Sequence, residues 1–347
     1  MQNSLLIIPF IFFLFYFLLK NNNFIINLID NDFNKPQSFH TTPTPRLGGF
    51  LIIITFLIIY LIQGHNFENS NYIIIFLLTN FFLGFFDDTK LIVNPIKRFL
   101  LFLLLNIILI YIFNIKIIDF DNNILNFLNN HSIYSASVLV LFSIFFCVNG
   151  SNLIDGFNGL LAIHSLIIIC FLLFNFGYDI KSDLNFFLIA FAFILFCFLI
   201  LNFPYSKIFL GDSGSFVIGT FLALAVITTS NKYDQISSYY FAILIYYIFF
   251  EIFFSVFRKV FQKKNPFKPD DEHLHMLLFN FLYQKNKRYL FCNYFTSIII
   301  NLIYLLSILP LIWIKNNYLL CEIYFFALIL FYLINYYVLK KLNEKKN

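Results

Sequence analysis

The chain has 347 residues, of which 60% are hydrophobic and only 12% are charged. A soluble domain of this length carries about a quarter charged residues and far fewer than the 53 Phe found here. This composition excludes two soluble domains, a disordered tail and a nucleic-acid binder. It indicates a polytopic membrane protein, because each membrane-spanning helix needs ~20 apolar residues. The five Cys lie in or beside apolar runs without paired spacing, so they predict neither a disulfide framework nor a zinc site.

Eleven apolar runs separated by polar breaks are the candidate spans. They cover about 4–20, 49–63, 71–86, 98–118, 133–149, 159–177, 184–201, 215–230, 238–257, 290–314 and 318–339. The second and third runs are short, so ten spans is the alternative count. We therefore predict an all-α integral membrane protein that forms a single polytopic domain over residues 1–347.

The basic residues are distributed unevenly between the two sides of this predicted bundle. If the connecting segments are numbered in order and the C-terminal tail joins the odd ones, the odd side holds 19 of the 23 Lys and Arg. The positive-inside rule then places the odd segments and the C-terminus in the cytoplasm and the N-terminus outside. Five polar segments on this side are expected to form the active site, at about 21–48, 87–97, 150–158, 202–214 and 258–289.

The first two of these segments carry an arginine and a pair of acids. Arg46 follows a Pro-rich turn and is a candidate phosphate contact. Asp87 and Asp88 lie side by side at the end of an apolar run, where two carboxylates repel each other. They indicate either a solvated helix end or a hard-cation site, because Mg²⁺ takes one or two carboxylates together with substrate phosphate oxygens.

The middle segments carry polar side chains that a simple turn does not explain. Asn152, Asp155 and Asn158 follow one another at three-residue intervals, so a helical run would place all three on one face. Gly211-Asp212-Ser213-Gly214-Ser215 opens the next apolar run and offers backbone N–H groups to an anion and a carboxylate to a metal. The alternative for that run is a simple N-cap by Asp212 or Ser213.

The last segment is basic and contains His273 and His275, whose i, i+2 spacing does not share a helix face and so disfavours a zinc pair. A turn could instead aim both rings at an anion, and a basic loop resting on anionic lipid is the competing interpretation. Glu251 is the one acid well inside a span. It is a site candidate by default, although Arg258, seven residues on, could form an ion pair with it.

This inventory favours phosphoryl transfer, which depends mostly on positioning and charge neutralisation. A transporter is the rival from another class, but it would place its polar residues near the bilayer midplane and often in an inverted repeat.

The segments HTTPTPRLGG, GFFDDTK, NLIDGFNGL, NFPYSKIFLGDSGS and HLHMLL resemble, in this order, the polyprenyl-phosphate N-acetylhexosamine-1-phosphate transferases. The family includes the undecaprenyl-phosphate GlcNAc-1-phosphate transferases and the phospho-MurNAc-pentapeptide transferase of peptidoglycan synthesis. The resemblance runs from about Lys35 to Leu278 and implies transfer of a sugar-1-phosphate from a UDP-sugar to a polyprenyl phosphate, with release of UMP.

The resemblance also implies roles for individual residues. Catalytic roles fall to Asp87, Asp88, Asp155, His273 and His275. Metal ligation falls to Asp212, with contributions from Asp87 and Asp88. Substrate binding falls to Lys35, Arg46, Asn152, Asn158, Asn202, Lys207 and Phe209, with Phe209 stacking on uracil. The expected cofactor is Mg²⁺, with Mn²⁺ as the alternative ion.

Departures from the peptidoglycan branch favour UDP-GlcNAc, or another UDP-N-acetylated hexosamine, over the MurNAc-pentapeptide nucleotide. Leu274 interrupts the three consecutive His of that branch, and Asn158 stands where it carries an acid. We expect an enzyme of the inner membrane that starts O-antigen or another cell-envelope glycan. Its expected partners are the UDP-sugar and the lipid phosphate, with no nucleic acid, and a homodimer is left open.

Overall fold

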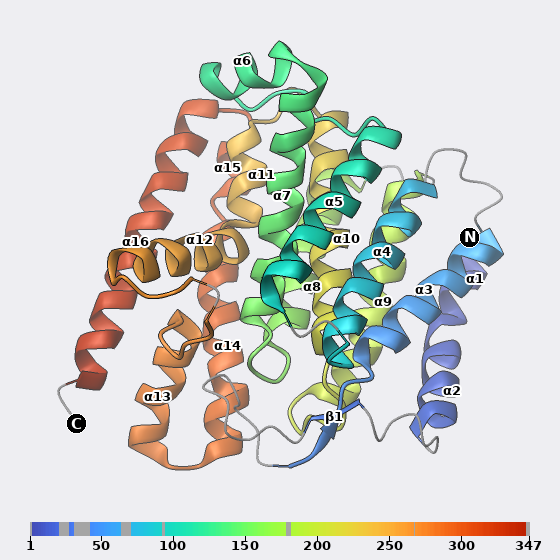
Figure 1. Ribbon diagram of the computed structural model, residues 1–347, viewed down its shortest axis with the longest axis vertical. Helices are drawn as coiled ribbons and strands as arrows, with labels where there is room; N and C mark the ends of the chain where they lie inside the picture. Colours follow the sequence, from blue (N-terminus) through green and yellow to red (C-terminus); the bar gives the residue numbers. More distant parts are fainter. Residues whose placement is uncertain are drawn as a thin grey trace.

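The computed structural model describes residues 2–20, 28–30, 42–63, 71–91, 94–177, 182–266 and 268–344. Figure 1 shows a bundle of helices, with the short helix α6 (Asn123–His131) at one end and most of the longer loops at the other. Strands β1 (Ile29–Asp30) and β2 (Thr44–Pro45) form a two-residue antiparallel ladder at the loop end. The fold is therefore that of an all-α membrane protein, as predicted.

Each of the eleven predicted runs contains a helix, but the fourth, 98–118, was predicted too long, because its helix ends at Ile112. The first six correspond to α1 (Gln2–Leu6) with α2 (Ile8–Lys20), α3 (Gly48–Gln63), α4 (Asn71–Asp88), α5 (Pro95–Ile112), α7 (Ile133–Ile154) and α8 (Leu160–Phe176). The others are α9 (Asp183–Asn202), α10 (Gly211–Lys232), α11 (Ser238–Leu244) with α12 (Tyr246–Phe261), α14 (Tyr289–Ile308) with α15 (Leu311–Ile314), and α16 (Tyr318–Glu344). A further helix, α13 (Leu274–Asn286), lies in the last basic segment.

Length and hydropathy separate these helices into groups. Within the described ranges, seven helical segments are long and apolar enough to cross a membrane, and the bent pair α11–α12 makes up to eight. Ser4–Lys20, Gly48–Gln63 and Leu160–Phe176 are apolar but shorter. The number of spans and the side that each loop faces therefore stay predictions.

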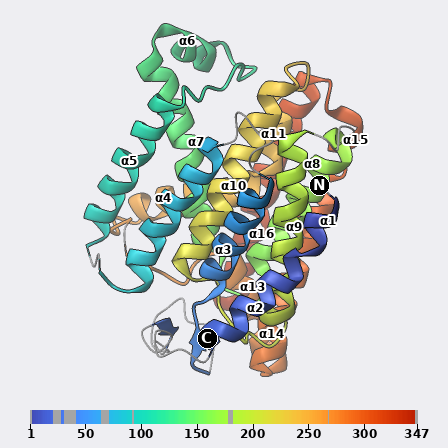
Figure 2. The same cartoon turned by 90° about the vertical axis from the view of Figure 1, so that its right-hand side faces the viewer.

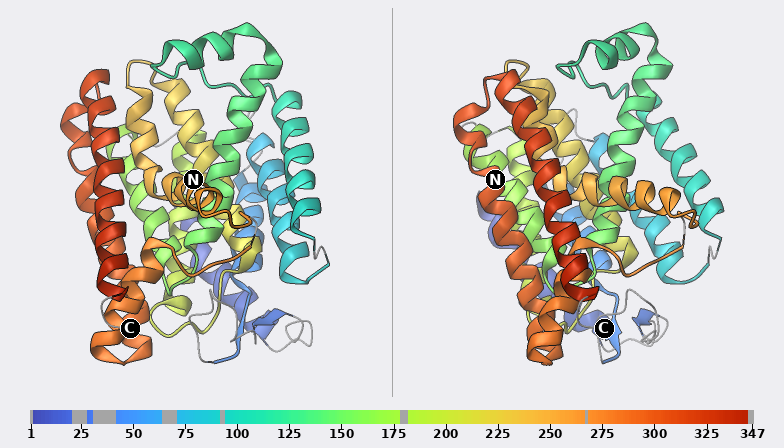
Figure 3. Two further views of the ribbon diagram at one scale, coloured as in Figure 1. Left: turned by 60° about the vertical axis from the view of Figure 1, so that its left-hand side comes forward. Right: turned by 90° about the vertical axis from the view of Figure 1, so that its left-hand side faces the viewer.

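The ninth predicted run is not the straight helix that its sequence indicates. α11 and α12 meet at an angle of 76° near Ile245, and α12 lies across the direction of the neighbouring helices (Figure 3). The run contains neither Pro nor Gly, so its sequence gives no local signal for a kink. The Tyr304 hydroxyl donates a hydrogen bond to the carbonyl of Leu244, the residue at which α11 ends. A tertiary contact thus satisfies a carbonyl that the bend leaves without its helical partner.

Helix α10 is the centre of the bundle. Its most apolar 18-residue window is 89% buried, against 17% for α5 and α16, and α5 lies at an edge of the bundle (Figure 2). A helix buried all round has to admit close neighbours, and Gly219 does so, because a Cβ there would lie 2.6 Å from the Cys147 carbonyl oxygen of α7. This rigid helix carries Asp212 in its first turn.

Candidate active site

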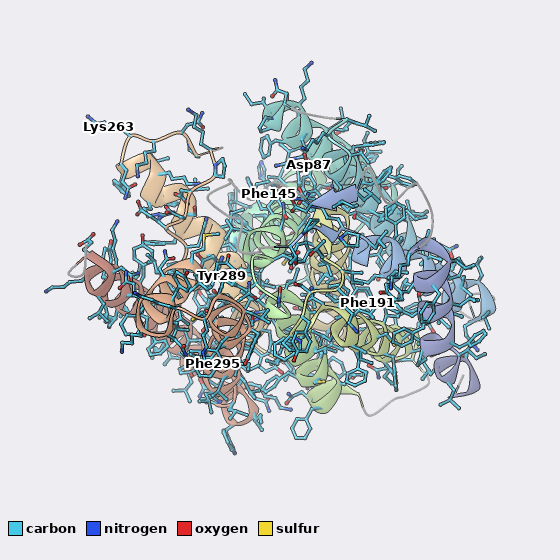
Figure 4. The ribbon with its side chains drawn as sticks, turned by 90° about the horizontal axis from the view of Figure 1, so that it is seen from below. Asp87, Phe145, Phe191, Lys263, Tyr289 and Phe295 are labelled. Atoms are coloured by element: carbon cyan, nitrogen blue, oxygen red, sulfur yellow. The ribbon has the colours of Figure 1, made fainter. Side chains whose placement is uncertain are left out.

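The structure brings the predicted segments together at the loop end of the bundle. The turn after β2 is hydrogen-bonded to the segment before α10, with Gly48 N donating to Phe209 O at 2.8 Å and Phe209 N to Pro45 O at 2.9 Å. The turn after α7 contacts the start of α13 through the rings of Phe157 and His275, whose centroids are 5.7 Å apart. Figure 4 views this end of the bundle and shows Asp87 among the helices, with Lys263 at the outer edge.

The two adjacent acids have different surroundings. The Asp88 side chain is only 1% exposed and caps α10, because Oδ1 accepts from Asp212 N at 2.9 Å and Oδ2 accepts from Ser213 N at 3.0 Å. Neither Asp212 nor Ser213 is the N-cap, since that position falls to Leu210, which makes no side-chain cap. Gly211 has φ +75°, and a Cβ there would lie 2.7 Å from Asp88 Oδ2. The glycine thus leaves room for a capping carboxylate supplied by α4.

Arg46 ties the first segment to this cap. Its Nη1 donates to Asp88 Oδ1 at 3.1 Å, and its Nη2 donates to Asp30 Oδ2 at 2.7 Å. Burial lowers the pKa of Arg46, but the negative charges of Asp212, Asp88 and Asp30 more than offset this and raise it. Arg46 therefore stays charged and holds the loop to the bundle, while Lys35 of the same predicted segment lies outside the described residues.

The carboxylates of Asp87 and Asp212 share one cation. Arg98 of α5 pairs with Asp87 Oδ2, and its Nη1 also lies 3.7 Å from Asp212 Oδ2. Sequence reasoning missed Arg98 as a site residue. The available signal was a single arginine near the start of an apolar helix, which contributed only to the charge count.

Asn152, Asp155 and Asn158 do not share a helix face, because α7 ends at Ile154 and the chain turns before α8. Asn152 Oδ1 accepts from Ser215 Oγ of α10 at 3.2 Å. Asn158 instead donates to Pro204 O at 2.7 Å and so joins two loops.

Asp155 is the C-cap residue of α7, and its carboxyl group interacts electrostatically with Asp212, Arg46 and Asp88. Its burial and the negative charge of Asp212 raise its pKa well above the ordinary value, while Arg46 opposes the shift. Asp155 therefore lies within electrostatic reach of both Asp212 and Arg46.

The three residues predicted to bind the nucleotide, Asn202, Lys207 and Phe209, differ in burial and in the hydrogen bonds that they already make. Asn202 is buried, its Oδ1 accepts from Gly159 N at 2.6 Å, and its Nδ2 donates to Ile208 O at 2.9 Å. Both ends of its amide thus hold loop backbone. Lys207 is exposed and Phe209 is half-buried.

His273 and His275 lie side by side, although their spacing does not share a helix face. His273 is the extended N-cap of α13 and His275 lies in its first turn, so their rings stack with centroids 5.6 Å apart and planes 6° apart. The predicted turn that aims both rings at an anion is not what His273 shows, because each of its nitrogens faces a carboxylate, of Glu251 or of Asp270. The His275 Nε2 is buried and has no hydrogen-bond partner in the described part of the chain.

These residues fit a magnesium ion that is completed by substrate. No group of three or more His, Cys, Asp or Glu is arranged as a metal site within the described ranges. Asp87 and Asp212, however, converge on one cation, and the oxygens of Asp88 are occupied by the cap. Two carboxylates together with phosphate oxygens are the donor set that Mg²⁺ commonly uses.

Comparisons with known proteins identify the family. The sequence signature of glycosyl transferase family 4 matches residues 70–230. The chain is 29% identical over 247 residues to the undecaprenyl-phosphate alpha-N-acetylglucosaminyl 1-phosphate transferase of Thermotoga maritima, covering 70% of this chain and 71% of the relative. It is 30% identical to the phospho-N-acetylmuramoyl-pentapeptide-transferase of Prochlorococcus marinus strain MIT 9215, covering 64% of this chain and 67% of the relative. For the enzyme of the same name from Prochlorococcus marinus subsp. pastoris, the identity is also 30%, and the match covers 59% of this chain and 62% of the relative. The chain belongs to glycosyl transferase family 4, within the superfamily of membrane-embedded polyprenyl-phosphate hexosamine-1-phosphate transferases.

Proposed function

We propose that this protein transfers an N-acetylhexosamine-1-phosphate, with GlcNAc-1-phosphate favoured, from a UDP-sugar to a polyprenyl phosphate such as undecaprenyl phosphate. In this reaction a lipid phosphate oxygen attacks the sugar-bound phosphorus, the bond to the bridging oxygen breaks, and UMP leaves. The observation that carries the proposal is the convergence of Asp87, Asp212 and Arg98 at the loop end of a family 4 bundle. Phosphoryl transfer needs this combination of fixed charges of both signs.

The residues of the site would position the substrates and stabilise charge. The second pKa of a phosphate monoester is about 6, so the lipid phosphate is largely a dianion at neutral pH and needs no obligatory base. Asp87 is then weighted toward metal binding and orientation, with proton abstraction as the competing role. His275 Nε2, which has no hydrogen-bond partner among the described residues, would donate to a phosphate oxygen, and the half-buried Phe209 would stack on uracil.

Mg²⁺ is the proposed cofactor, held by Asp212 and Asp87. When bound, it would neutralise the charge of the diphosphate. Arg98 already places a positive charge between these two carboxylates, which supports a cation-binding role for the pair.

The proposed location is the inner membrane, with the site facing the cytoplasm, where a soluble nucleotide sugar meets a lipid. The bias of 19 of 23 basic residues toward the odd segments supports this orientation. The proposed reaction would then be the first membrane step of O-antigen or another cell-envelope glycan.

A panel of radiolabelled UDP-sugars, incubated with polyprenyl phosphate and Mg²⁺, tests the proposal. We expect UMP release and a labelled lipid with UDP-GlcNAc, and neither product with Asp212→Ala or with EDTA. Turnover of UDP-MurNAc-pentapeptide alone would establish the second candidate, which the Prochlorococcus relatives support. Uptake of the sugar into vesicles without UMP release would refute both and favour a transporter.

A further inference from the structure

Glu251 is a buried carboxylate that the transfer reaction described above does not use. It lies on α12 and is 1% exposed. The sequence suggested an ion pair between Glu251 and Arg258, but Arg258 pairs instead with Asp270 at 2.9 Å and with Glu272 at 3.1 Å. Glu251 Oε2 instead accepts from the Tyr332 hydroxyl of α16 at 2.7 Å. A buried charge needs such partners, and the remaining ones belong to the histidine segment.

His273 is held between two carboxylates. Its Nδ1 lies 3.1 Å from Glu251 Oε1, and its Nε2 lies 3.2 Å from Asp270 Oδ1. A carboxylate oxygen only accepts hydrogen bonds, so a ring with a carboxylate at each nitrogen is satisfied when both nitrogens carry protons. Burial lowers the pKa of His273, but the carboxylates of Asp270 and Glu251 beside its two nitrogens outweigh burial and raise it. Among the described residues, Glu251, Asp270 and His275 contact the ring directly. Tyr332 and Arg258 act on it through Glu251 and Asp270, respectively.

The same glutamate also fixes the start of α13. Glu251 Oε1 accepts from Leu274 N at 3.1 Å, whereas the N-cap residue His273 makes no side-chain cap of its own. A carboxylate at this position satisfies a free backbone N–H and interacts favourably with the helix dipole. The first turn of α13 therefore depends on a residue that comes from another helix.

That first turn sets the position of the second histidine. The Tyr247 hydroxyl lies 3.3 Å from His275 Nδ1, and a Cβ on Gly156, next to Asp155, would lie 3.8 Å from His275 Nε2. Burial lowers the pKa of His275 to about 4, so this ring is neutral near pH 7. If Tyr247 donates to Nδ1, the proton of the neutral ring lies on Nε2, which faces the Asp155 turn.

We propose that Glu251 is a positioning residue that, together with Asp270, holds His273 as a fixed imidazolium and thereby aims His275 at the reacting phosphates. The two histidines then have different tasks. His273 supplies a permanent positive charge and an anchored helix start, and His275 supplies the hydrogen-bond donor. Tyr332 completes the arrangement, because it links Glu251 to the C-terminal helix α16.

The protonation state of His273 can be measured without any activity. In protein labelled with ¹⁵N-histidine, the chemical shifts of the ring nitrogens distinguish protonated from unprotonated forms, and the spectrum of His273→Gln assigns the signals. We expect both His273 nitrogens to be protonated at pH 7, and Glu251→Gln to lower the titration of the ring by at least about one pH unit, a tenfold change in proton affinity. One unprotonated His273 nitrogen in the unmodified protein at pH 7 would overturn the proposal. This measurement is independent of the proposed function, so the two can fail separately.

Kinetics supply the second arm, which rests on the proposed transferase activity. We expect Glu251→Gln to lower kcat by roughly 10- to 100-fold, the usual effect of removing a carboxylate that orients a functional histidine, with the KM for the UDP-sugar changed far less. Glu272→Gln is the matched control, since Glu272 bonds Lys340 at 2.8 Å rather than a histidine, and its kcat should stay within about twofold. Equal losses in the two variants would refute the positioning role. If Glu251→Gln does not fold, Tyr332→Phe, which removes only the hydroxyl donor, should lower kcat in the same direction, and an unchanged kcat would count against the proposal.

Discussion

Asp87 and Asp88 are adjacent and chemically identical, yet the structure predicts opposite consequences for replacing each by Asn. The Asp88 carboxylate accepts from Arg46 Nη1, Asp212 N and Ser213 N. An Asn side chain keeps one acceptor oxygen, and its NH₂ group must face at least one of these donors. One buried N–H is then left unsatisfied at a cost of about 1–3 kcal/mol. Loss of the negative charge at the α10 N-terminus adds up to about 2 kcal/mol, so we expect a total destabilisation of roughly 1–5 kcal/mol.

Asp87→Asn is the matched variant, because its carboxylate is 18% exposed and is paired with Arg98, which lies near the surface. Such pairs contribute at most about 1 kcal/mol, so this variant should unfold close to the unmodified protein while losing transferase activity. The assay is thermal unfolding of both variants in one detergent with EDTA present, so that bound metal does not contribute. Equal shifts of the unfolding midpoint, or a larger shift for Asp87→Asn, would refute the assignment of Asp88 to the cap.

Three further changes test other parts of the site. Asn202→Asp should lower the unfolding temperature, because a carboxylate oxygen would face the Ile208 carbonyl oxygen to which the amide now donates. Normal stability with only a raised KM for the UDP-sugar would instead favour a purely uracil-binding role. Asp155→Asn should raise the unfolding temperature at neutral pH, because a pKa raised by folding means that ionisation of Asp155 destabilises the folded state. The gain should vanish as the pH falls to 3.8, the ordinary pKa of an Asp side chain, where the unfolded chain also becomes protonated. Arg98→Gln should increase the affinity for Mg²⁺, measured by calorimetry, at least about fivefold. The variant removes the repulsion between the Arg98 cation and a metal bound at Asp212, which amounts to at least ~1 kcal/mol at such short range. An unchanged affinity would show that the metal binds elsewhere.

The eleven helical runs could be predicted because the signal is local. An apolar stretch of membrane-crossing length has few alternatives to a helix, since backbone polar groups must be satisfied internally. The bend at Ile245 could not be predicted, because the run itself carries no kink signal and the side chain that satisfies the Leu244 carbonyl, Tyr304, lies 60 residues away in sequence. The short helix α6 was not expected either, because its polar sequence reads as an outer loop.

In the site, too, the sequence indicated which residues gather together but not the long-range contacts that each one makes. The sequence indicated that Arg46, Asp155 and Asp212 belong to one cluster, because carboxylates and an arginine are rare in so apolar a chain, and the electrostatic effects on Asp155 agree. It did not indicate what each polar group bonds. Asn158 reads as a ligand from its spacing, but its amide holds Pro204. Arg98 reads as an ordinary loop charge, but it joins two acids.

One part of the distinction between the two acids was nevertheless present in the sequence. Gly84 precedes Asp88 by four residues, so the two lie on one face of α4, whereas Asp87 is rotated by about 100° from Asp88. A Cβ on Gly84 would lie 2.4 Å from the Asp212 carbonyl oxygen, so this face has to be the one that approaches the start of α10. An acid one turn after a glycine on a contact face is placed to cap the helix that the glycine admits, and its neighbour is turned away from that contact, toward Arg98. The spacing Gly-Phe-Phe-Asp-Asp thus places the second acid on the face that contacts α10 and leaves the first for the proposed metal site.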